Sequence, residues 1–315
     1  MRDLSRKHHY LPQFYLAGFT DSQAKDGTLH VFDKEQCKQW ETTPAATAWE
    51  RDLYMLEAGD EKVDLLEKLN ADYEALVAPI LAQVRANCTL PDGDAMGILI
   101  GFVAMMEVRV PTFRDSLNHN MANLANAMVR THLATRERWQ ETLQAMKAAG
   151  YVAPEVGYEE MLDFVERGDY ELTVHQNFYL EMVGTSWYTM TQILANRHWS
   201  RLSTGSDTEF VCSDSPLSII WLHDDHPRWA QPGFGLGGTE VVLPISSSVA
   251  LASRFEDDLP ESLEVDRANV ARINSRTIKA PARFIYSRLA QFSWFLRQGI
   301  VGGPEELVRH LQARR

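Results

Sequence analysis

The sequence predicts an α+β protein: a large helical middle packed on a mostly antiparallel sheet formed by C-terminal strands, with an N-terminal hairpin. Between about residues 60 and 199, apolar residues recur mostly at three- and four-residue steps, which is the period of an amphipathic helix. After residue 199, short β-branched and aromatic runs alternate with Gly, Pro, Ser and Asp turns. This alternation is typical of antiparallel strands, so the two halves of the chain indicate different secondary structure.

The helical middle divides at proline and glycine positions. Pro79 is expected to kink the first helix, Pro111 to end the second, and Gly150 to stop the third. The second helix is apolar nearly all round, which predicts a central place in the core. His175 and His198 are expected on the last helix as satisfied core groups. The helices are expected over residues 60–84, 94–105, 116–149, 155–166 and 169–199.

The strands are short and separated by turn residues. An early strand at 28–32 is expected to form a hairpin with the segment around Gln39 and Trp40. Later strands are expected at 208–212, 217–222, 240–245, 249–252 and 283–287. A helix over 265–278 interrupts them, and Pro304 opens a last helix.

We expect these elements to form a single domain over residues 1–315. The N-terminal motif and hairpin occupy about 1–56, the helical region about 60–199, the β-rich region about 200–290 and the C-terminal helices about 291–315.

Composition excludes several classes of protein. A chain of 315 residues, with 45% hydrophobic and 23% charged residues, can bury a sizeable core. Its net charge of −12 argues against non-specific binding of nucleic acid through a basic surface. Cys37, Cys88 and Cys212 are odd in number and widely spaced, so they indicate neither a disulfide framework nor a structural zinc site.

The sequence also predicts where in the cell the protein is found. The polar N-terminus has no signal-peptide core, and the apolar run before Glu107 is shorter than the roughly 20 residues that span a membrane. We therefore expect a soluble, cytoplasmic protein with no membrane contact.

The densest chemistry lies near the N-terminus, in residues 6–19, RKHHYLPQFYLAGF. Lys7, His8 and His9 place three proton carriers or anion-binding groups in a row, and Tyr10 begins a series of aromatic residues. Adjacent side chains point to different faces, so only one histidine can face a given pocket, and we assign His8 to it. Burial beside Lys7 would lower the pKa of His8 and leave a neutral general base.

A structural interpretation of the same stretch is the alternative. Pro12 would set an extended start, and the aromatic residues after it would bury one or two helical turns as a docking arm.

Other candidate site residues are spread along the chain. Arg109 and Arg114 flank a proline break, where two guanidiniums could clamp a phosphate or carboxylate or pair with acidic residues. Ser213 and Asp214 lie in a turn between expected strands, where the aspartate could orient a histidine or bond its own backbone. Glu50 lies among aromatic residues and could enter a partly buried site or remain an exposed acid.

Metal and cofactor signals are weak. His223, Asp224, Asp225 and His226 have the composition of metal ligands, but their Pro- and Gly-rich surroundings favour an exposed loop. Glu67 and Glu74 share a helix face without a Glu-x-x-His motif, which favours a solvated face. No dinucleotide fingerprint, phosphate-loop lysine motif or Gly-x-Ser-x-Gly elbow is present. The sequence indicates no organic cofactor and leaves a divalent metal open.

The opening motif also carries a family resemblance. The string KHHYLPQFYLAGF at 7–19 resembles the N-terminal signature of a bacterial family called domain of unknown function 4238. Shorter stretches resemble the same family, and Ser215 departs from the amide-bearing residue that its pattern favours. The resemblance covers about residues 5 to 290, and because the family's activity is not established it implies a set of positions and no reaction. The shorter stretches are ERDLY at 50–54, DLLEKLNADYE at 64–74, VRVPTFR at 108–114, FVCSDSP at 210–216 and VLPIS at 242–246.

Two functions follow from these residues. The first is a hydrolase-like enzyme, with or without a metal, acting on an anionic small molecule or nucleotide-like substrate. In it His8 is the acid or base, Asp214 orients it, and Glu50 is a third candidate catalytic residue or a metal ligand. Its basic clamp would be formed by Lys7, Arg109 and Arg114, and Tyr10 and Ser213 are further candidate substrate-binding residues. The second is a non-catalytic binding or interaction protein, a sensor or defence component, in which the N-terminal motif is structural.

Overall fold

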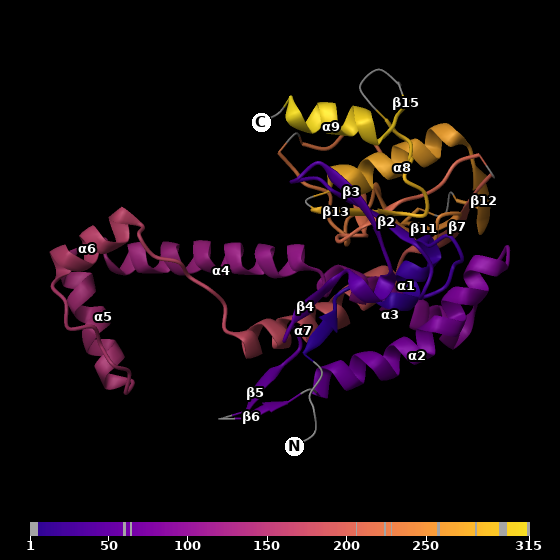
Figure 1. The fold of residues 1–315 in the computed structure, drawn as a ribbon. Coiled ribbons are helices and arrows are strands. Elements are labelled where there is room, and N and C mark those ends of the chain that lie inside the picture. Colours follow the sequence, from indigo (N-terminus) through magenta and orange to yellow (C-terminus); the bar gives the residue numbers. More distant parts are fainter. Residues whose placement is uncertain are drawn as a thin grey trace. The chain divides into compact units, whose positions relative to one another are not determined.

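The computed structural model describes residues 6–58, 61–63, 65–205, 207–223, 225–227, 229–256, 259–280, 282–295 and 301–313. The chain forms two compact units, Met1–Phe113 with Leu180–Arg315 and, separately, Arg114–Tyr179. The α+β prediction is confirmed: helices α2–α7 occupy the middle of the chain, and several mostly antiparallel sheets are built from the strands before and after them (Figure 1).

The C-terminal strands, expected in one sheet, lie in two larger sheets, and β14 (Trp294–Phe295) pairs separately with β15 (Val301–Gly302). The larger has the order β12-β7-β11-β10-β9, in which only the β12–β7 pair is parallel. Its strands are β12 (Ser262–Val265), β7 (His198–Thr204), β11 (Val249–Arg254), β10 (Thr239–Pro244) and β9 (Ser218–Trp221).

The smaller sheet joins the two ends of the chain. It has the order β3-β2-β13-β8 and is antiparallel throughout. The expected N-terminal hairpin forms its β2–β3 pair, and Val31 of β2 lies opposite Tyr286 of β13. Its strands are β3 (Lys38–Thr42), β2 (Leu29–Asp33), β13 (Phe284–Ser287) and β8 (Cys212–Ser213).

β10 and β11 supply much of the core of the larger sheet, since every residue of β10 is buried. The helix α8 (Arg267–Lys279) contributes Val270 and Ile273 to the same core. Asp266 caps this helix, because its side chain accepts a hydrogen bond from the backbone N–H of Asn269 at 2.8 Å.

β7 is one of the strands that the sequence analysis does not predict. Its polar residues are buried because distant backbone groups satisfy them: Ser200 donates to the carbonyl of Pro260 at 2.6 Å, and Arg201 donates to that of Val84 at 2.8 Å.

In the larger unit, the second predicted helix ends before Pro111, as expected. α2 (Leu65–Ala86) contains Pro79, and α3 (Gly93–Val108) is largely buried. Pro111 is the first residue of the following helix, a position where its missing N–H leaves no hydrogen bond unmade. Among the described residues, no single helix is long and apolar enough to cross a membrane. The bent pair of α3 and the helix α4 (Pro111–His132) meets the criteria for a membrane span by length and composition only.

Two predictions about the helices are corrected, the first of them in the smaller unit. The single helix expected over 116–149 is two helices, α4 (Pro111–His132) and α5 (Arg136–Ala148). The chain breaks because Thr135 caps α5, accepting from the N–H of Arg138 at 3.2 Å. Gly150 ends α5 with φ of +80°, as predicted. Leu133, Trp139 and Val165 form the core of this unit, the last from α6 (Tyr158–Arg167).

The second correction concerns α7 (Gln176–Ala195), which is shorter than the expected 169–199. His175 therefore precedes the helix, and His198 is the first residue of β7. The remaining elements are short: α1 (Gln13–Leu16), β1 (Lys7–His9), β4 (Trp49–Arg51), β5 (Leu56–Ala58), β6 (Glu61–Val63), β14 (Trp294–Phe295), β15 (Val301–Gly302) and α9 (Pro304–Gln312).

Candidate functional site

The N-terminal signature begins as a short strand. β1 pairs antiparallel with β4, which places Lys7 opposite Arg51, His8 opposite Glu50 and His9 opposite Trp49. Side chains alternate across a strand, so His8 is fully buried, whereas its two neighbours are not. Strand pairing, which the sequence does not reveal, therefore decides which histidine faces inward.

His8 is enclosed by Tyr54. Its Nδ1 accepts a hydrogen bond from the backbone N–H of Tyr54 at 2.8 Å, and the two rings stack with centroids 5.5 Å apart. Because Nδ1 is an acceptor, the neutral ring carries its proton on Nε2. With 0% of its surface exposed, His8 is not placed to meet a dissolved substrate. This arrangement matches the structural alternative for the signature.

Arg109 joins the signature to the helices. Its guanidinium donates to the Tyr54 hydroxyl at 2.9 Å, to Oε1 of Glu74 at 2.7 Å and to the carbonyl of His9 at 2.7 Å. Burial acts to lower the pKa of Arg109, but Tyr54 and Glu74 outweigh it and raise the pKa. All three nitrogens are occupied, so Arg109 is an ion-paired structural residue.

Arg85, which the sequence analysis missed, joins the other end of the signature to α2 and β10 through hydrogen bonds. It donates to the carbonyls of Phe14 at 3.1 Å, Tyr15 at 2.9 Å and Ile245 at 2.9 Å. The Tyr15 hydroxyl donates to the carbonyl of Pro244 at 2.7 Å. Burial lowers the pKa of Arg85 to about 10, still well above neutrality. These bonds tie α1 to the end of β10.

Asp214 lies where β8 ends. Its carboxylate accepts the backbone N–H groups of Arg283 and Phe284, both at 3.1 Å. Burial raises its pKa to about 6, against the effect of those two hydrogen bonds. Tyr10 is the signature residue that interacts with Asp214: burial, then the carboxylate, raise the pKa of this phenol. The hydroxyl of Tyr286 is buried nearby, and burial, then Tyr10 and Asp214, raise its pKa well above the ordinary value.

The other predicted residues lie around this cluster or outside it. Glu50 is half-buried and contributes to the raised pKa of Tyr10. Ser213 is buried and donates to the carbonyl of Ser215 at 2.8 Å. Lys7 is exposed; its Nζ donates to the carbonyl of Ala45 at 2.5 Å and lies 4.7 Å from the centre of the Trp49 ring.

Arg114 belongs to the smaller unit, where it is half-buried. The predicted pair of arginines is therefore divided between the two units. The sequence analysis missed Glu107 of α3, a half-buried carboxyl whose pKa burial raises to about 7. The sequence signal that could have identified Glu107 is its position as a carboxylate near the end of an apolar helix.

The weak metal candidates do not form a cluster. His223 and Asp225 are exposed, and His226 stacks on Trp221 with ring centroids 4.7 Å apart. Asp224 lies outside the described residues. Across the described part of the chain, no group of three His, Cys, Asp or Glu side chains could hold a metal ion.

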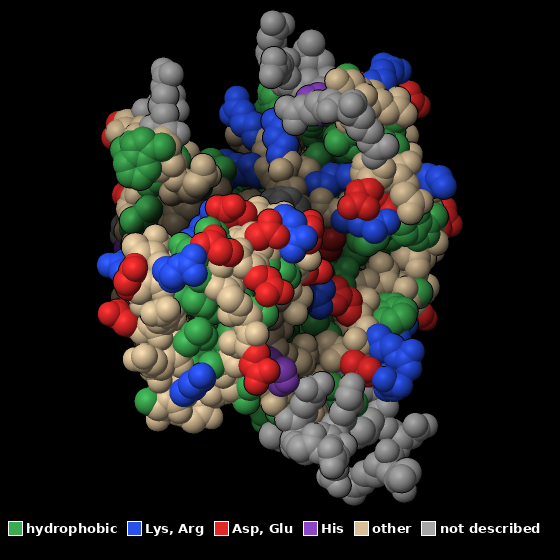
Figure 2. All heavy atoms as spheres, turned by 90° about the vertical axis from the view of Figure 1, so that its left-hand side faces the viewer, with side chains coloured by type: hydrophobic (Ala, Val, Ile, Leu, Met, Phe, Trp, Pro, Cys, Tyr) green, Lys and Arg blue, Asp and Glu red, His purple; other side chains and the backbone are tan. Residues whose placement is uncertain are grey.

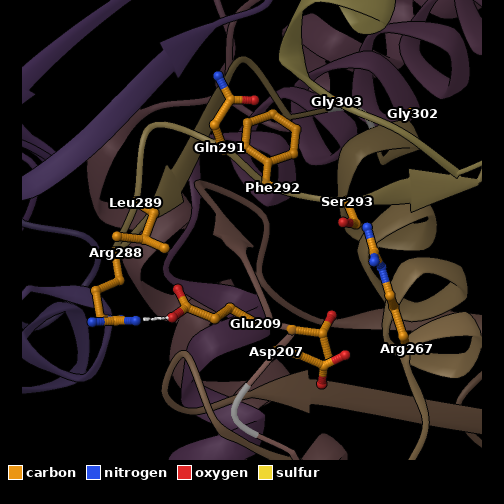
Figure 3. Close-up of a pocket in the computed structure, with 11 residues that line it drawn as sticks. Asp207, Glu209, Arg267, Arg288, Leu289, Gln291, Phe292, Ser293, Gly302 and Gly303 are labelled. Carbon is orange, nitrogen blue, oxygen red and sulfur yellow. Dashed lines mark hydrogen bonds and ion pairs between the residues drawn. The ribbon is translucent and has the colours of Figure 1, made fainter.

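A polar cavity of about 390 Å³ lies elsewhere in the larger unit. Its walls come from the segment before β8, the first residue of α8, the segment between β13 and β14, and the two glycines that precede α9. Figure 3 shows Glu209 and Arg288 paired on one side and Arg267 on the other. The lining residues are Asp207, Thr208, Glu209, Arg267, Arg288, Leu289, Gln291, Phe292, Ser293, Gly302 and Gly303.

Several polar side chains that line this cavity have no hydrogen-bond or ion-pair partner among the described residues. Thr208 is only 6% exposed, yet its buried hydroxyl has no hydrogen-bond partner among the described residues. Within the same described ranges, neither Arg267 nor Asp207 makes a side-chain hydrogen bond or ion pair. Such groups are available to a ligand. Sequence reasoning missed all three, because they lie in polar turns and at a helix start that look like ordinary surface.

The chain was compared with models of known protein families. The model of the family described as "Protein of unknown function (DUF4238)" matches residues 7–290. The chain belongs to the DUF4238 family. The resemblance inferred from the opening signature is confirmed. Searches of curated proteins and of solved structures found no match.

The structure also shows that several of the segments that resemble the family interact with one another. Tyr54 and Glu74, from two of the family-like stretches, converge on Arg109, from a third. Pro244 and Asp214 come from two more: the carbonyl of Pro244 accepts a hydrogen bond from Tyr15, and the Asp214 carboxylate acts electrostatically on Tyr10 and raises its pKa. In this DUF4238 protein the recognisable positions assemble around the N-terminal segment.

Proposed function

We propose that this DUF4238 protein binds a small anionic molecule in the Thr208 cavity, the polar cavity described above, and that its N-terminal signature is structural. One observation carries the proposal. The Arg267 guanidinium and the buried Thr208 hydroxyl line the same cavity, and neither has a partner among the described side chains and backbone groups.

The energetics favour an anion. A guanidinium presents donors in a planar fork that matches a carboxylate or phosphate, so Arg267 can bind either bidentately. A buried hydroxyl without a partner costs about 1–3 kcal/mol, and a ligand oxygen that accepts its proton removes this cost. Asp207 lines the same cavity and supplies an acceptor for an N–H or O–H group of the ligand.

The size of the cavity is also suitable. Small-molecule sites commonly enclose about 300–1,000 Å³, and this cavity measures about 390 Å³. By contrast, the residues of the hydrolase hypothesis serve the fold: His8 is closed off by Tyr54, and Asp214 holds two backbone N–H groups of the β13 region.

Isothermal titration calorimetry with phosphate, citrate, glutamate and adenosine monophosphate tests the proposal. At least one of these anions should bind, and Arg267→Ala should weaken binding at least about tenfold, the loss expected for a charge-assisted hydrogen bond. Arg272→Ala, on the same helix but outside the cavity, is the matched control and should bind as wild type does. Absence of binding by all four anions, or unchanged binding by Arg267→Ala, would refute the proposal.

Thr208→Val provides a second test that does not depend on knowing the ligand. Valine keeps the shape but removes the unpaired hydroxyl, so the unliganded variant should unfold at the same or a higher temperature than wild type. Affinity for the anion should fall, because the hydrogen bond to the ligand is lost. A variant that is less stable and binds equally well would show that the hydroxyl is satisfied within the protein.

A hydrolase is the second candidate, supported by the Asp214 carboxyl, whose pKa is about 6, and by the buried hydroxyls of Tyr10 and Tyr286, which interact with it. A carboxyl that titrates near neutral pH suits general acid–base catalysis. Phosphate and carboxylate esters are the substrates to assay. Hydrolysis that Asp214→Asn abolishes and Arg267→Ala preserves would favour this function over the binding proposal.

A further inference from the structure

We propose that the protein has a second ligand site, for an aliphatic carboxylate, in a cavity of about 220 Å³ bounded by α8 and the β12–β7 edge of the larger sheet. We call it the Arg272 cavity. It shares no lining residue with the Thr208 cavity, so it stands independently of the proposed function.

The floor of the Arg272 cavity is apolar. Leu202, Ala252 and Ile273 belong to the buried core of the larger sheet, and they line the cavity as well. Leu263 of the edge strand β12 also lines it and remains 39% exposed. A hydrocarbon chain placed here would continue the core outwards and cover apolar surface that water now meets.

The rim is basic. Glu240 is almost buried between Arg254 and Arg276, with contacts of 2.5 Å to each guanidinium. Burial acts to raise the pKa of Glu240, but the two arginines outweigh it and lower the pKa, so the carboxylate is charged. Arg272 is a third cation on the rim, and among the described residues it has no acidic partner. One carboxylate therefore faces three guanidiniums.

The helix places these groups on one side. Asn269, Arg272, Ile273 and Arg276 follow the spacing that puts residues on a single helix face. Arg272 donates to Oδ1 of Asn269 at 3.2 Å, and its guanidinium lies over the ring of Phe295 at 5.3 Å. These contacts hold the guanidinium at the rim, where it can bind a second carboxylate.

The apolar floor and the rim, which has three arginines and one carboxylate among the lining residues, together define the ligand class. The chain of an aliphatic carboxylate would lie against the leucines, and its head group would pair with Arg272. An amine of the same length would meet three like charges, and a short carboxylate would forgo the apolar burial.

Titration calorimetry with butyrate, hexanoate, octanoate and octylamine tests the inference. Affinity should rise about fourfold per methylene from butyrate to octanoate, the gain that each buried methylene supplies, until the cavity is full. Octylamine should not bind. Arg272→Ala should weaken octanoate binding at least about tenfold, and Leu263→Asn should reduce the gain per methylene.

Lys279→Ala is the matched control, because this exposed cation lies on the same helix but lines neither cavity, and it should leave octanoate binding unchanged. Affinity that is independent of chain length, equal binding of octylamine, or full binding by Arg272→Ala would overturn the inference. The crossed pair of arginine variants, Arg267→Ala and Arg272→Ala, also separates the two proposals, since each variant should impair only one class of ligand.

Discussion

The N-terminal signature and the Thr208 cavity differ in whether their polar groups are hydrogen-bonded to the rest of the described protein. Around the signature, all three nitrogens of Arg85 and of Arg109 donate to protein oxygens. In the cavity, Arg267 and Thr208 have no such partners among the described residues. We therefore infer that the polar residues of the signature serve stability, and we propose ligand binding where polar groups lack a partner among the described residues.

This contrast predicts that changes at the signature lower stability and spare binding, whereas changes in the cavity do the reverse. The largest effect is expected for Arg109→Met. Removing a guanidinium that is only 3% exposed leaves Glu74 without its partner, which should cost about 3–5 kcal/mol in the free energy of unfolding. Urea denaturation measures it. A loss below about 1 kcal/mol would show that the network is not a structural tie.

Asp214→Asn should change the pH dependence of stability. The folded pKa of Asp214 is about 6, above the ordinary 3.8, so the native state holds this proton more tightly than the unfolded state does. The stabilisation is complete below about pH 4 and is lost as the pH rises through 6. Relative to wild type, the asparagine variant should therefore gain up to about 3 kcal/mol between pH 4 and pH 7.

Denaturant unfolding at several pH values measures this difference between variant and wild type. The comparison is needed because other carboxyls, including Glu107 with its pKa of about 7, titrate in the same range. A difference that does not vary with pH would contradict the raised pKa of Asp214.

His8→Ala should cost about 2 kcal/mol, because it leaves the Tyr54 N–H unbonded and opens a void beside the ring. His9→Ala is the matched comparison. Its side chain is half-buried and its Nε2 has no hydrogen bond to the described residues, so the loss should be smaller. Thermal unfolding of both variants tests this order, and an equal loss would contradict the enclosed position of His8.

The smallest effect on stability is expected for Arg267→Ala. The side chain is exposed and unpaired within the described residues, so the free energy of unfolding should change by less than about 0.5 kcal/mol. Anion binding should nevertheless fall at least tenfold. A variant that loses stability while it keeps binding would reverse the contrast between the two regions.

The sequence by itself determined the elements whose signals are local. The apolar period and the breaks at Pro111 and Gly150 placed α2, α3 and the end of α5, and apolar runs placed β10 and β11. The signature also identified the family. These features depend on residues close in the chain, so a linear pattern contains them.

Only the tertiary structure decided which polar residues are satisfied. The buried Arg201 of β7 is satisfied by the carbonyl of Val84, and His8 faces inward in the strand that pairs with β4. Thr208 and Arg267 line one cavity although they are far apart in sequence. Hydrogen bonding and burial depend on partners that folding brings together, and no periodicity in the chain encodes those partners.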